Sequence, residues 1–232
     1  MEHKNWTDGY SSDVTYTKGY YKTQSPRNIA LAILARGFMP PKLENFRYLE
    51  LGFGQGLSFN IHAAALNGEF WGCDFNPQHA LHAQKLATAS GADARVLNDS
   101  FEELLARDDL PEFDYISMHG VWTWVSDKNR EAILELLRRK LKVGGALQVS
   151  YNCQPGWAPV VPLVNLMKLH KEVTAVASED PRESFRKAIE FANVVSQTDA
   201  RFFAANPDAK AHLEALKNQD TNYLVHEYFH DF

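Results

Sequence analysis

Short apolar runs alternate with helix-type repeats over the first two thirds of the chain. Five runs have the length and the aromatic or branched content of buried strands, and they are RYLEL (47–51), FWGCDF (70–75), ARVLN (94–98), FDYISMH (113–119) and GALQVSYN (145–152). Apolar positions at helical spacing separate them. Strands that alternate with helices in this way predict a parallel, doubly wound α/β sheet.

Start and stop signals place the ends of the helices between these strands. The helix after the first strand is expected to close at Asn67–Gly68, and the next is expected to run from Pro77 to Gly91. Ser100 and Glu103 have capping-box spacing, and Ser126 is a candidate cap for a helix over 126–141.

The pattern changes at both ends of this alternation. Residues 1–25 are polar and rich in tyrosine, which predicts an arm or lid, and residues 26–154 form the predicted core. Residues 155–232 hold helical patterns, at 160–176, 180–195 and 207–218. We expect these helices to form a cap over the ends of the strands.

Composition narrows the class of function. The net charge of −5 and a pI near 6.0 weigh against binding to nucleic-acid backbones. No apolar run approaches the ~20 residues of a membrane span. The chain has two cysteines and no CxxC pair, which fits a cytoplasmic location and gives neither a disulfide framework nor a zinc knuckle.

A glycine-rich turn follows the first predicted strand, in LELGFGQG (49–56). Gly52 and Gly54 fit the dinucleotide fingerprint, but Leu57 stands where its third glycine belongs, and the phosphate-loop Lys-Ser/Thr is absent. Glu50 would repel a diphosphate on this turn and would attract an ammonium or sulfonium group. The three glycines, with Gly56, would let the backbone approach a ligand closely. S-adenosylmethionine has both cationic groups and a nucleoside.

The next two strand ends carry acids that suit the rest of this ligand. Asp74, with Phe75 beside it, stands where an acid accepts both ribose hydroxyls, and Asp99 could accept from the adenine amino group. Backbone N–H groups from Ser100 onward could reach a ring nitrogen. The alternatives are that Asp74 caps the helix beginning at Pro77 and that Ser100 only caps its own helix.

The last two strand ends supply candidate catalytic groups. His119 could contact the methionine part of the cofactor or act as a base, or it could be a core histidine. Tyr151 and Asn152 have polar ends suited to positioning a substrate, or they could belong to a turn before Pro155.

Over roughly residues 45–152, the chain resembles class I S-adenosylmethionine-dependent methyltransferases. The resemblance is carried by the motifs LELGFGQG, GCDFNP, LNDSFEELL and FDYISMHGVWTWV. More narrowly, DFNP, HGVWTWV and YNCQPGW resemble the bacterial subgroup in which a methyltransferase regulatory domain follows the catalytic domain. That subgroup includes protein-lysine methyltransferases acting on outer-membrane proteins. The resemblance implies methyl transfer, S-adenosylmethionine as cofactor, and a tyrosine-rich arm, including Tyr16, that folds over the cofactor; loose surface packing of the arm is the alternative.

Other features leave alternatives open. The class normally has a seven-stranded sheet, so either this chain is a fragment of a longer protein or its sheet is shorter than usual. The acceptor is a protein lysine by resemblance, or a small-molecule oxygen or nitrogen, and a non-catalytic cofactor-binding module is a further possibility. The motif Asn/Asp-Pro-Pro-Tyr/Phe, which marks methyltransferases acting on exocyclic amino groups of nucleobases, is absent after the fourth strand. Its absence argues against a nucleic-acid acceptor. HEYFH (226–230) matches the zinc-protease pattern H-E-x-x-H, but we expect no metal site because the resemblance assigns it to the methyltransferase.

Overall fold

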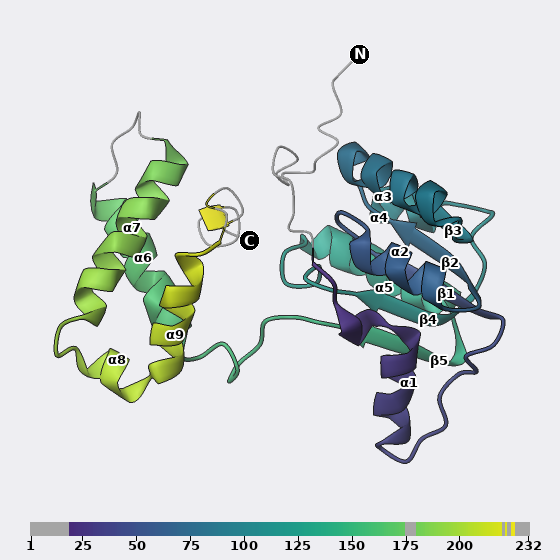
Figure 1. Ribbon diagram of the computed structural model, residues 1–232, viewed down its shortest axis with the longest axis horizontal. Coiled ribbons are helices and arrows are strands. Elements are labelled where there is room, and N and C mark those ends of the chain that lie inside the picture. Colours follow the sequence, from purple (N-terminus) through teal and green to yellow (C-terminus); the bar gives the residue numbers. More distant parts are fainter. Residues whose placement is uncertain (1–18, 175–179, 220, 222–223, 226–232) are drawn as a thin grey trace. The chain divides into compact units, whose positions relative to one another are not determined.

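The structure is a computed structural model and describes residues 19–174, 180–219, 221 and 224–225 (Figure 1). The chain forms two compact units that meet between Tyr151 and Asn152, near the boundary expected after residue 154. Each unit is described by itself. Tyr16 and the HEYFH segment lie outside the described residues.

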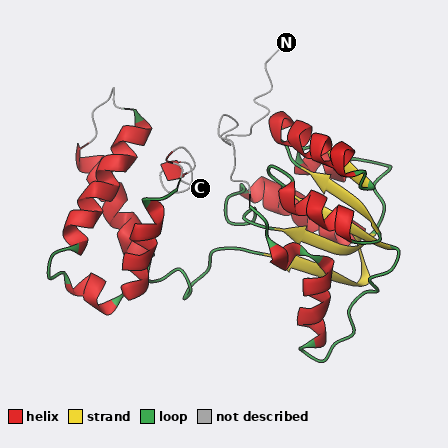
Figure 2. Cartoon of the chain, in the orientation of Figure 1, coloured by secondary structure: helices red, strands yellow, loops and turns green. Residues whose placement is uncertain are grey.

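The first unit is built on one five-stranded sheet in which all strands are parallel (Figure 2). In the order in which they lie across the sheet, the strands are β3 (Ala94–Leu97), β2 (Gly68–Cys73), β1 (Phe46–Leu51), β4 (Phe113–Met118) and β5 (Leu141–Val149). The predicted doubly wound α/β fold is confirmed. Because the order reverses beside β1, the carboxyl ends of β1 and β4 flank the place where such sheets bind ligands.

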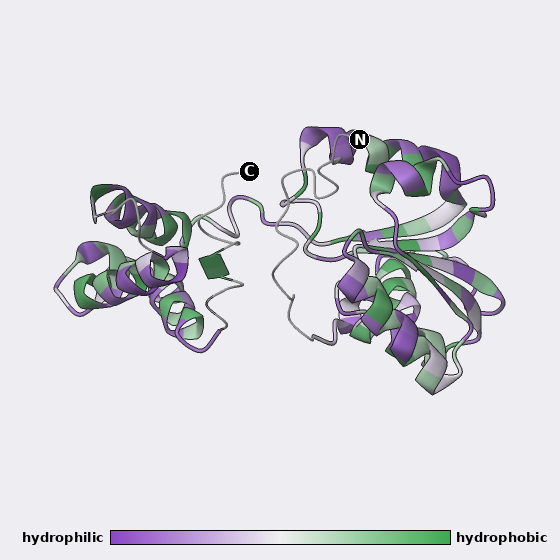
Figure 3. Ribbon diagram, turned by 90° about the horizontal axis from the view of Figure 1, so that it is seen from above, coloured by the Kyte–Doolittle hydropathy of each residue, from purple (hydrophilic) through white to green (hydrophobic). Residues whose placement is uncertain are grey.

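Helices cover both faces of the sheet. They are α1 (Pro26–Leu34), α2 (Leu57–Ala65), α3 (Pro77–Ser90), α4 (Phe101–Leu105) and α5 (Asp127–Lys140), and a short 3-10 helix, η1 (Lys22–Gln24), precedes them. Hydrophobic and hydrophilic residues alternate along these helices (Figure 3), and the buried apolar ones join the two cores described below.

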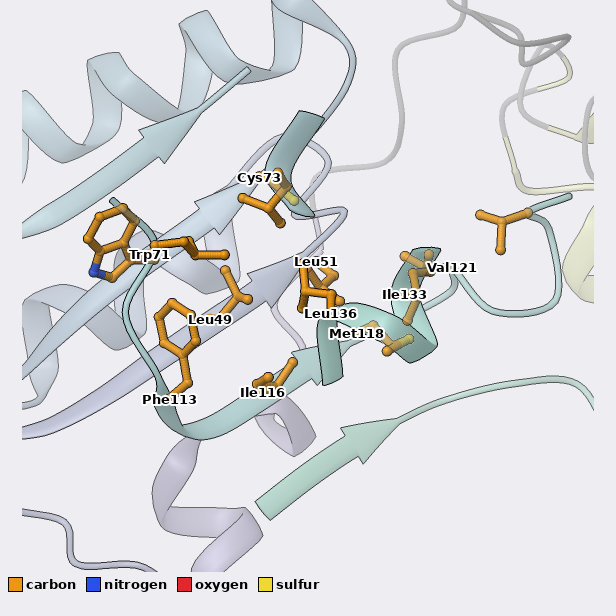
Figure 4. Close-up of a cluster of buried hydrophobic side chains, with 13 residues drawn as sticks. Leu49, Leu51, Trp71, Cys73, Phe113, Ile116, Met118, Val121, Ile133 and Leu136 are labelled. Carbon is orange, nitrogen blue, oxygen red and sulfur yellow. The ribbon is translucent and has the colours of Figure 1, made fainter. Parts of the chain in front are cut away.

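Two hydrophobic cores fix this arrangement. One core joins strand residues such as Leu49 and Ile116 to Leu104 of α4 and Ile133 of α5 (Figure 4). The other core packs aromatic side chains of the sheet's second face against α1, α2 and α3. Alternate residues of β1 therefore face opposite layers, as a strand buried on both sides requires.

Three helix-end predictions are confirmed and one is wrong. Ser100 forms a complete capping box with Glu103, Ser126 caps α5, and Gly91 ends α3 with φ 66°. The predicted closure of α2 at Asn67–Gly68 is incorrect, because α2 ends at Ala65 and Gly68 is the first residue of β2. A Cβ there would lie 2.7 Å from Phe46 Cζ, so this glycine allows a ring to pack across the strand.

The fifth strand also begins earlier than predicted, at Leu141 instead of residue 145. Leu141 pairs with Phe113, and a register shift between Phe113 and Tyr115 accommodates the extra residues. The glycine pair at 144–145 marks this irregularity inside the strand and not its start.

The second unit is helical, as the sequence predicts. Its helices are α6 (Val161–Thr174), α7 (Pro181–Ser196), α8 (Arg201–Ala205) and α9 (Pro207–Leu216). Phe185 and Leu163 lie at the centre of its own hydrophobic core. The five-residue helix α8 was not predicted, because one turn shows no periodicity. That these helices cap the strand ends stays a prediction.

Candidate functional site

The glycine turn links β1 to α2 and is built from left-handed backbone. Gly52, Gly54 and Gly56 have φ values of 68°, 59° and 72°. A Cβ on Gly52 would lie 2.6 Å from Val121 Cγ2, and one on Gly56 would lie 2.4 Å from Ala83 Cβ. Both conformation and space therefore require glycine, and the turn keeps a bare backbone at the carboxyl end of β1.

Asp74 follows β2 and fixes the shape of this turn. Its Oδ2 accepts the Gly54 N–H at 2.8 Å, and its Oδ1 accepts the Asn76 N–H at 2.9 Å and lies 3.2 Å from His79 Nδ1. A carboxylate oxygen has two acceptor positions, so Oδ2 keeps one for a ligand hydroxyl. Asp74 is not the cap of α3, because Asn76 is the residue that accepts the Gln78 N–H.

Glu50 is buried near the end of β1, with only 2% of its surface exposed. The Tyr48 hydroxyl donates to its Oε2 at 2.8 Å, and the Gln24 side chain forms a second hydrogen bond. Removal from water raises the pKa of Glu50 to about 7, and these two hydrogen bonds only partly oppose that rise. The sequence predicted this acid at the site, whereas its buried environment follows from the fold.

Asp99 and Ser100 follow β3, and both already have protein partners. Asp99 Oδ2 accepts from Arg107 Nη1 at 3.0 Å. The Ser100 N–H donates to Glu103 Oε2 at 2.9 Å inside the capping box, and contact of the backbone from Ser100 onward with the cofactor stays a prediction. Contact of Asp99 with adenine stays a prediction.

Asn98 was missed by the sequence analysis, and it ties two strand ends together. Its Nδ2 donates to the backbone oxygens of Asp74 at 2.9 Å and Phe75 at 3.0 Å. The carboxyl ends of β2 and β3 are therefore joined beside the glycine turn. The sequence offers little indication of this role, because an asparagine after a strand more often indicates a turn.

His119 follows β4 and lies half-buried beside the same edge. Its Nδ1 is 2.9 Å from Ser150 Oγ, which also accepts the Gly120 N–H at 2.9 Å. Burial lowers the pKa of His119, which favours the neutral ring at pH 7. The Tyr21 ring lies over it, with ring centroids 4.0 Å apart.

The segment before α1 lies across this edge of the sheet. Besides the ring contact with His119, the Tyr21 N–H donates to Ser58 Oγ at 2.7 Å, and Gln24 reaches Glu50. A tyrosine of the predicted arm thus lies at the site. The role predicted for Tyr16 stays a prediction.

The two remaining candidates lie where the units join. Tyr151 is 55% exposed, and Asn152 begins the second unit. Both follow β5 in the sequence. Their predicted role in substrate positioning stays a prediction.

Taken as a set, these groups suit a cationic nucleoside. Two acids belong to the site: Glu50 lies on β1 just before the turn, and Asp74 accepts the Gly54 N–H within a turn that has no lysine of the phosphate-loop type. A diphosphate would meet two acids, whereas an ammonium and a ribose would each meet one. The fold and the site define a Rossmann-like nucleoside-binding domain.

Comparisons with known proteins find similarity to methyltransferases. Residues 49–145 match the family described as "Methyltransferase domain". The chain is 40% identical over 229 residues to the uncharacterized protein sll1526 of Synechocystis sp., covering 97% of this chain and 44% of that protein. It is 26% identical to the uncharacterized protein RP789 of Rickettsia prowazekii, covering 94% of this chain and 41% of that one.

A solved structure agrees along most of the chain. PKMT2 from Rickettsia typhi, in complex with AdoHcy, matches 94% of this chain and 41% of its own with a TM-score of 0.73 and 25% identity. Residues 49–145 therefore match a methyltransferase domain, and the five-stranded parallel sheet is the Rossmann-like fold of class I methyltransferases, as the resemblance implied. The chain spans less than half the length of these relatives.

Proposed function

We propose that the protein transfers the methyl group of S-adenosylmethionine to lysine side chains of a protein substrate. The observation that carries the cofactor assignment is the pair of buried acids beside the glycine turn, Glu50 on the strand before it and Asp74 bonded to the Gly54 N–H. The protein acceptor is supported by the likeness to PKMT2 of Rickettsia typhi, which extends into the second, helical unit of this chain.

Each part of the cofactor has a matching group at the edge of the sheet. The free acceptor position on Asp74 Oδ2 would take a ribose hydroxyl, and ionised Glu50 would attract the ammonium group. Asp99 would accept from the adenine amino group. The turn from Gly52 to Gly56 would pass beside the ligand without side chains between them.

When bound, S-adenosylmethionine supplies a methyl group already activated by the sulfonium charge. The protein's part is to orient the two reactants and to keep water away from them. A lysine ammonium must lose a proton before its nitrogen can react. His119, whose pKa is lowered by burial, is neutral at pH 7 and can accept that proton directly or through water. Tyr151 and Asn152 would position the acceptor.

Turnover with labelled cofactor tests the acceptor. We expect S-adenosylhomocysteine to form with a lysine-rich peptide, and no label to enter a matched peptide in which arginine replaces each lysine. The same assay on fractionated lysate should place the label in protein. Label in small molecules alone would favour the O- or N-methyltransferase alternative, and cofactor binding without any turnover would favour a non-catalytic module.

Three coarser features complete the proposal. Among the described residues, no helix has the length and apolar character needed to cross a bilayer. Cys73 and Cys153 are both free thiols, which supports a cytoplasmic location. The acidic net charge supports a protein or small-molecule acceptor over a nucleic acid.

A further inference from the structure

A row of polar side chains crosses the sheet behind the cofactor site. Glu50 on β1 stands opposite Ser117 on β4, which in turn stands opposite Gln148 on β5. Tyr48 lies two residues before Glu50, on the same face of β1, and Gln24 approaches from η1. We name these five residues the Glu50 network. Polar groups are rare at such depth in a parallel sheet, and these are connected to one another.

The members of the network are linked in series. Tyr48 donates to Glu50 Oε2 at 2.8 Å, and the Ser117 side chain forms a hydrogen bond with Tyr48. Ser117 Oγ lies 2.6 Å from Gln148 Oε1. Burial keeps the Tyr48 phenol protonated by raising its pKa well above the ordinary value. Tyr48 and Ser117 are fully buried, so their bonding capacity must be met inside this network.

This chain of groups can satisfy either protonation state of Glu50. When Glu50 is ionised, Tyr48 donates to it, Ser117 donates to Tyr48, and the Gln148 amide turns its NH2 group toward Ser117. When Glu50 is protonated, its own O–H donates to Tyr48, Tyr48 donates to Ser117, and Ser117 donates to Gln148 Oε1. Hydroxyls rotate and an amide can present either end, so neither state leaves a buried donor or acceptor unmatched.

The surroundings of Glu50 leave a place for one positive charge. In residues 19–174, no lysine, arginine or histidine forms a salt bridge with Glu50. The titratable neighbours are Tyr48 from β1 and Cys73 from β2, while η1 and β4 contribute the neutral Gln24 and Ser117. Burial raises the pKa of Cys73, so this thiol stays neutral. Within the part of the chain that the structure describes, the buried carboxylate thus has no cationic partner, and the ammonium group of the ligand would supply one.

We propose that the Glu50 network links cofactor binding to loss of a proton from Glu50, with Tyr48 as the positioning residue that stabilises the carboxylate for the ligand's ammonium group. Affinity for the cofactor then rises with pH. Ligand binding favours ionised Glu50, and by linkage the ionised form favours the ligand. The inference rests on the Glu50–ammonium contact of the proposed function and adds the groups that control it.

Calorimetry with S-adenosylhomocysteine between pH 5.5 and 8.5 tests this link without any methyl transfer. We expect affinity to fall by up to about tenfold for each pH unit below the midpoint of Glu50. 5′-Methylthioadenosine lacks the amino-acid part, so its affinity should stay nearly constant over the same range. Glu50→Gln should remove the pH step that separates the two ligands.

Tyr48→Phe is the decisive variant, and Tyr115→Phe is its matched control. Tyr115 is also a buried tyrosine of the sheet, but its hydroxyl donates to the Pro41 oxygen at 2.6 Å and not to Glu50. We expect Tyr48→Phe to move the midpoint to higher pH, with affinity near pH 7 reduced about three- to tenfold and the loss shrinking toward pH 8.5. Tyr115→Phe should keep the parent midpoint.

The possible outcomes separate failure of the Glu50 network from failure of the cofactor site. Superimposable pH profiles for the two phenylalanine variants, or an equal pH step for 5′-methylthioadenosine, would overturn the role of the network while leaving the cofactor site in place. Failure of S-adenosylhomocysteine to bind at any pH would overturn the cofactor site as well. If Tyr48→Phe does not fold, Ser117→Ala removes the group behind Tyr48 and should shift the midpoint in the same direction.

Discussion

At the scale of single residues, identical chemistry has different consequences in different places. Glu50 and Asp74 are both buried acids beside one turn. Asp74 accepts two backbone N–H groups and shapes the turn, whereas Glu50 accepts only from neutral side chains and is held near the point of titration. Backbone donors stabilise a carboxylate, and burial without a charge partner disfavours it.

Gly56→Ala should be strongly destabilising through both backbone strain and a steric clash. Gly91→Ala separates these two causes, because it introduces only the strain. Both glycines have left-handed φ, at 72° and 66°, but an added Cβ at Gly91 meets nothing within 4 Å. We expect Gly91→Ala to lower the free energy of unfolding by ~1 kcal/mol, from backbone strain alone. Gly56→Ala should lose that amount plus ~1–3 kcal/mol for the clash with Ala83. Urea unfolding of both variants measures the difference, and equal losses would contradict the close approach of α3.

At the scale of elements, the strand ends and helix starts form the site together. α4 is only five residues long, from Phe101 to Leu105, so its own hydrogen bonds cannot hold it. The capping box at Ser100 compensates, and Arg107 after the helix binds Asp99 before it. These contacts close the β3 end of the site into a compact loop.

Ser100→Ala should therefore cost ~1 kcal/mol of unfolding free energy and weaken nucleoside binding, because Asp99 stands on the loosened loop. Thr88→Ala is the control, since its hydroxyl bonds only the Gln84 oxygen on the exposed face of α3. That control should stay within ~0.5 kcal/mol of the parent. Equal stability of the two variants would show that tertiary packing alone holds α4.

At the scale of the whole molecule, the buried Glu50 lowers the stability of the first unit when it is ionised. Folding moves the pKa of Glu50 from its ordinary 4.5 to about 7. The folded state then binds the proton more tightly than the unfolded state, so stability is fully present below pH 4.5 and is lost as pH rises toward and through 7. A bound cation would restore this stability, because a ligand that favours ionised Glu50 in the folded state also stabilises that state.

Glu50→Gln should consequently stabilise the protein at pH 8, by on the order of 1–3 kcal/mol, and change it little at pH 4.5. The amide keeps the hydrogen bonds of Tyr48 and Gln24 without the buried charge. Thermal unfolding at the two pH values measures this, with Asp74→Asn as the matched variant, which should destabilise because two N–H donors lose their charged acceptor. A fall in stability of Glu50→Gln at pH 8 would contradict the burial argument.

Much of the fold is readable from local signals, whereas features that depend on residues distant in the sequence are not. Gly91, Ser100 and Ser126 end or start helices through contacts within a few residues, so their roles were predicted correctly. Gly68 was taken for a helix stop because its true reason, the Phe46 ring packed across it, comes from another strand. The candidate acids were found from their places after apolar runs.

What the sequence by itself determined is the alternation of strands and helices, the glycine turn, and the acids at the strand ends, because each depends on periodicity or on neighbours along the chain. Only the tertiary structure decided the environment of those acids. Tyr48 lies only two residues before Glu50 but is inconspicuous in the sequence, whereas Ser117 and Gln148 are far away in the sequence and join the network only through the pairing of β1, β4 and β5. Burial and cross-strand partners set the ionisation of a carboxyl group, and both arise when the sheet assembles.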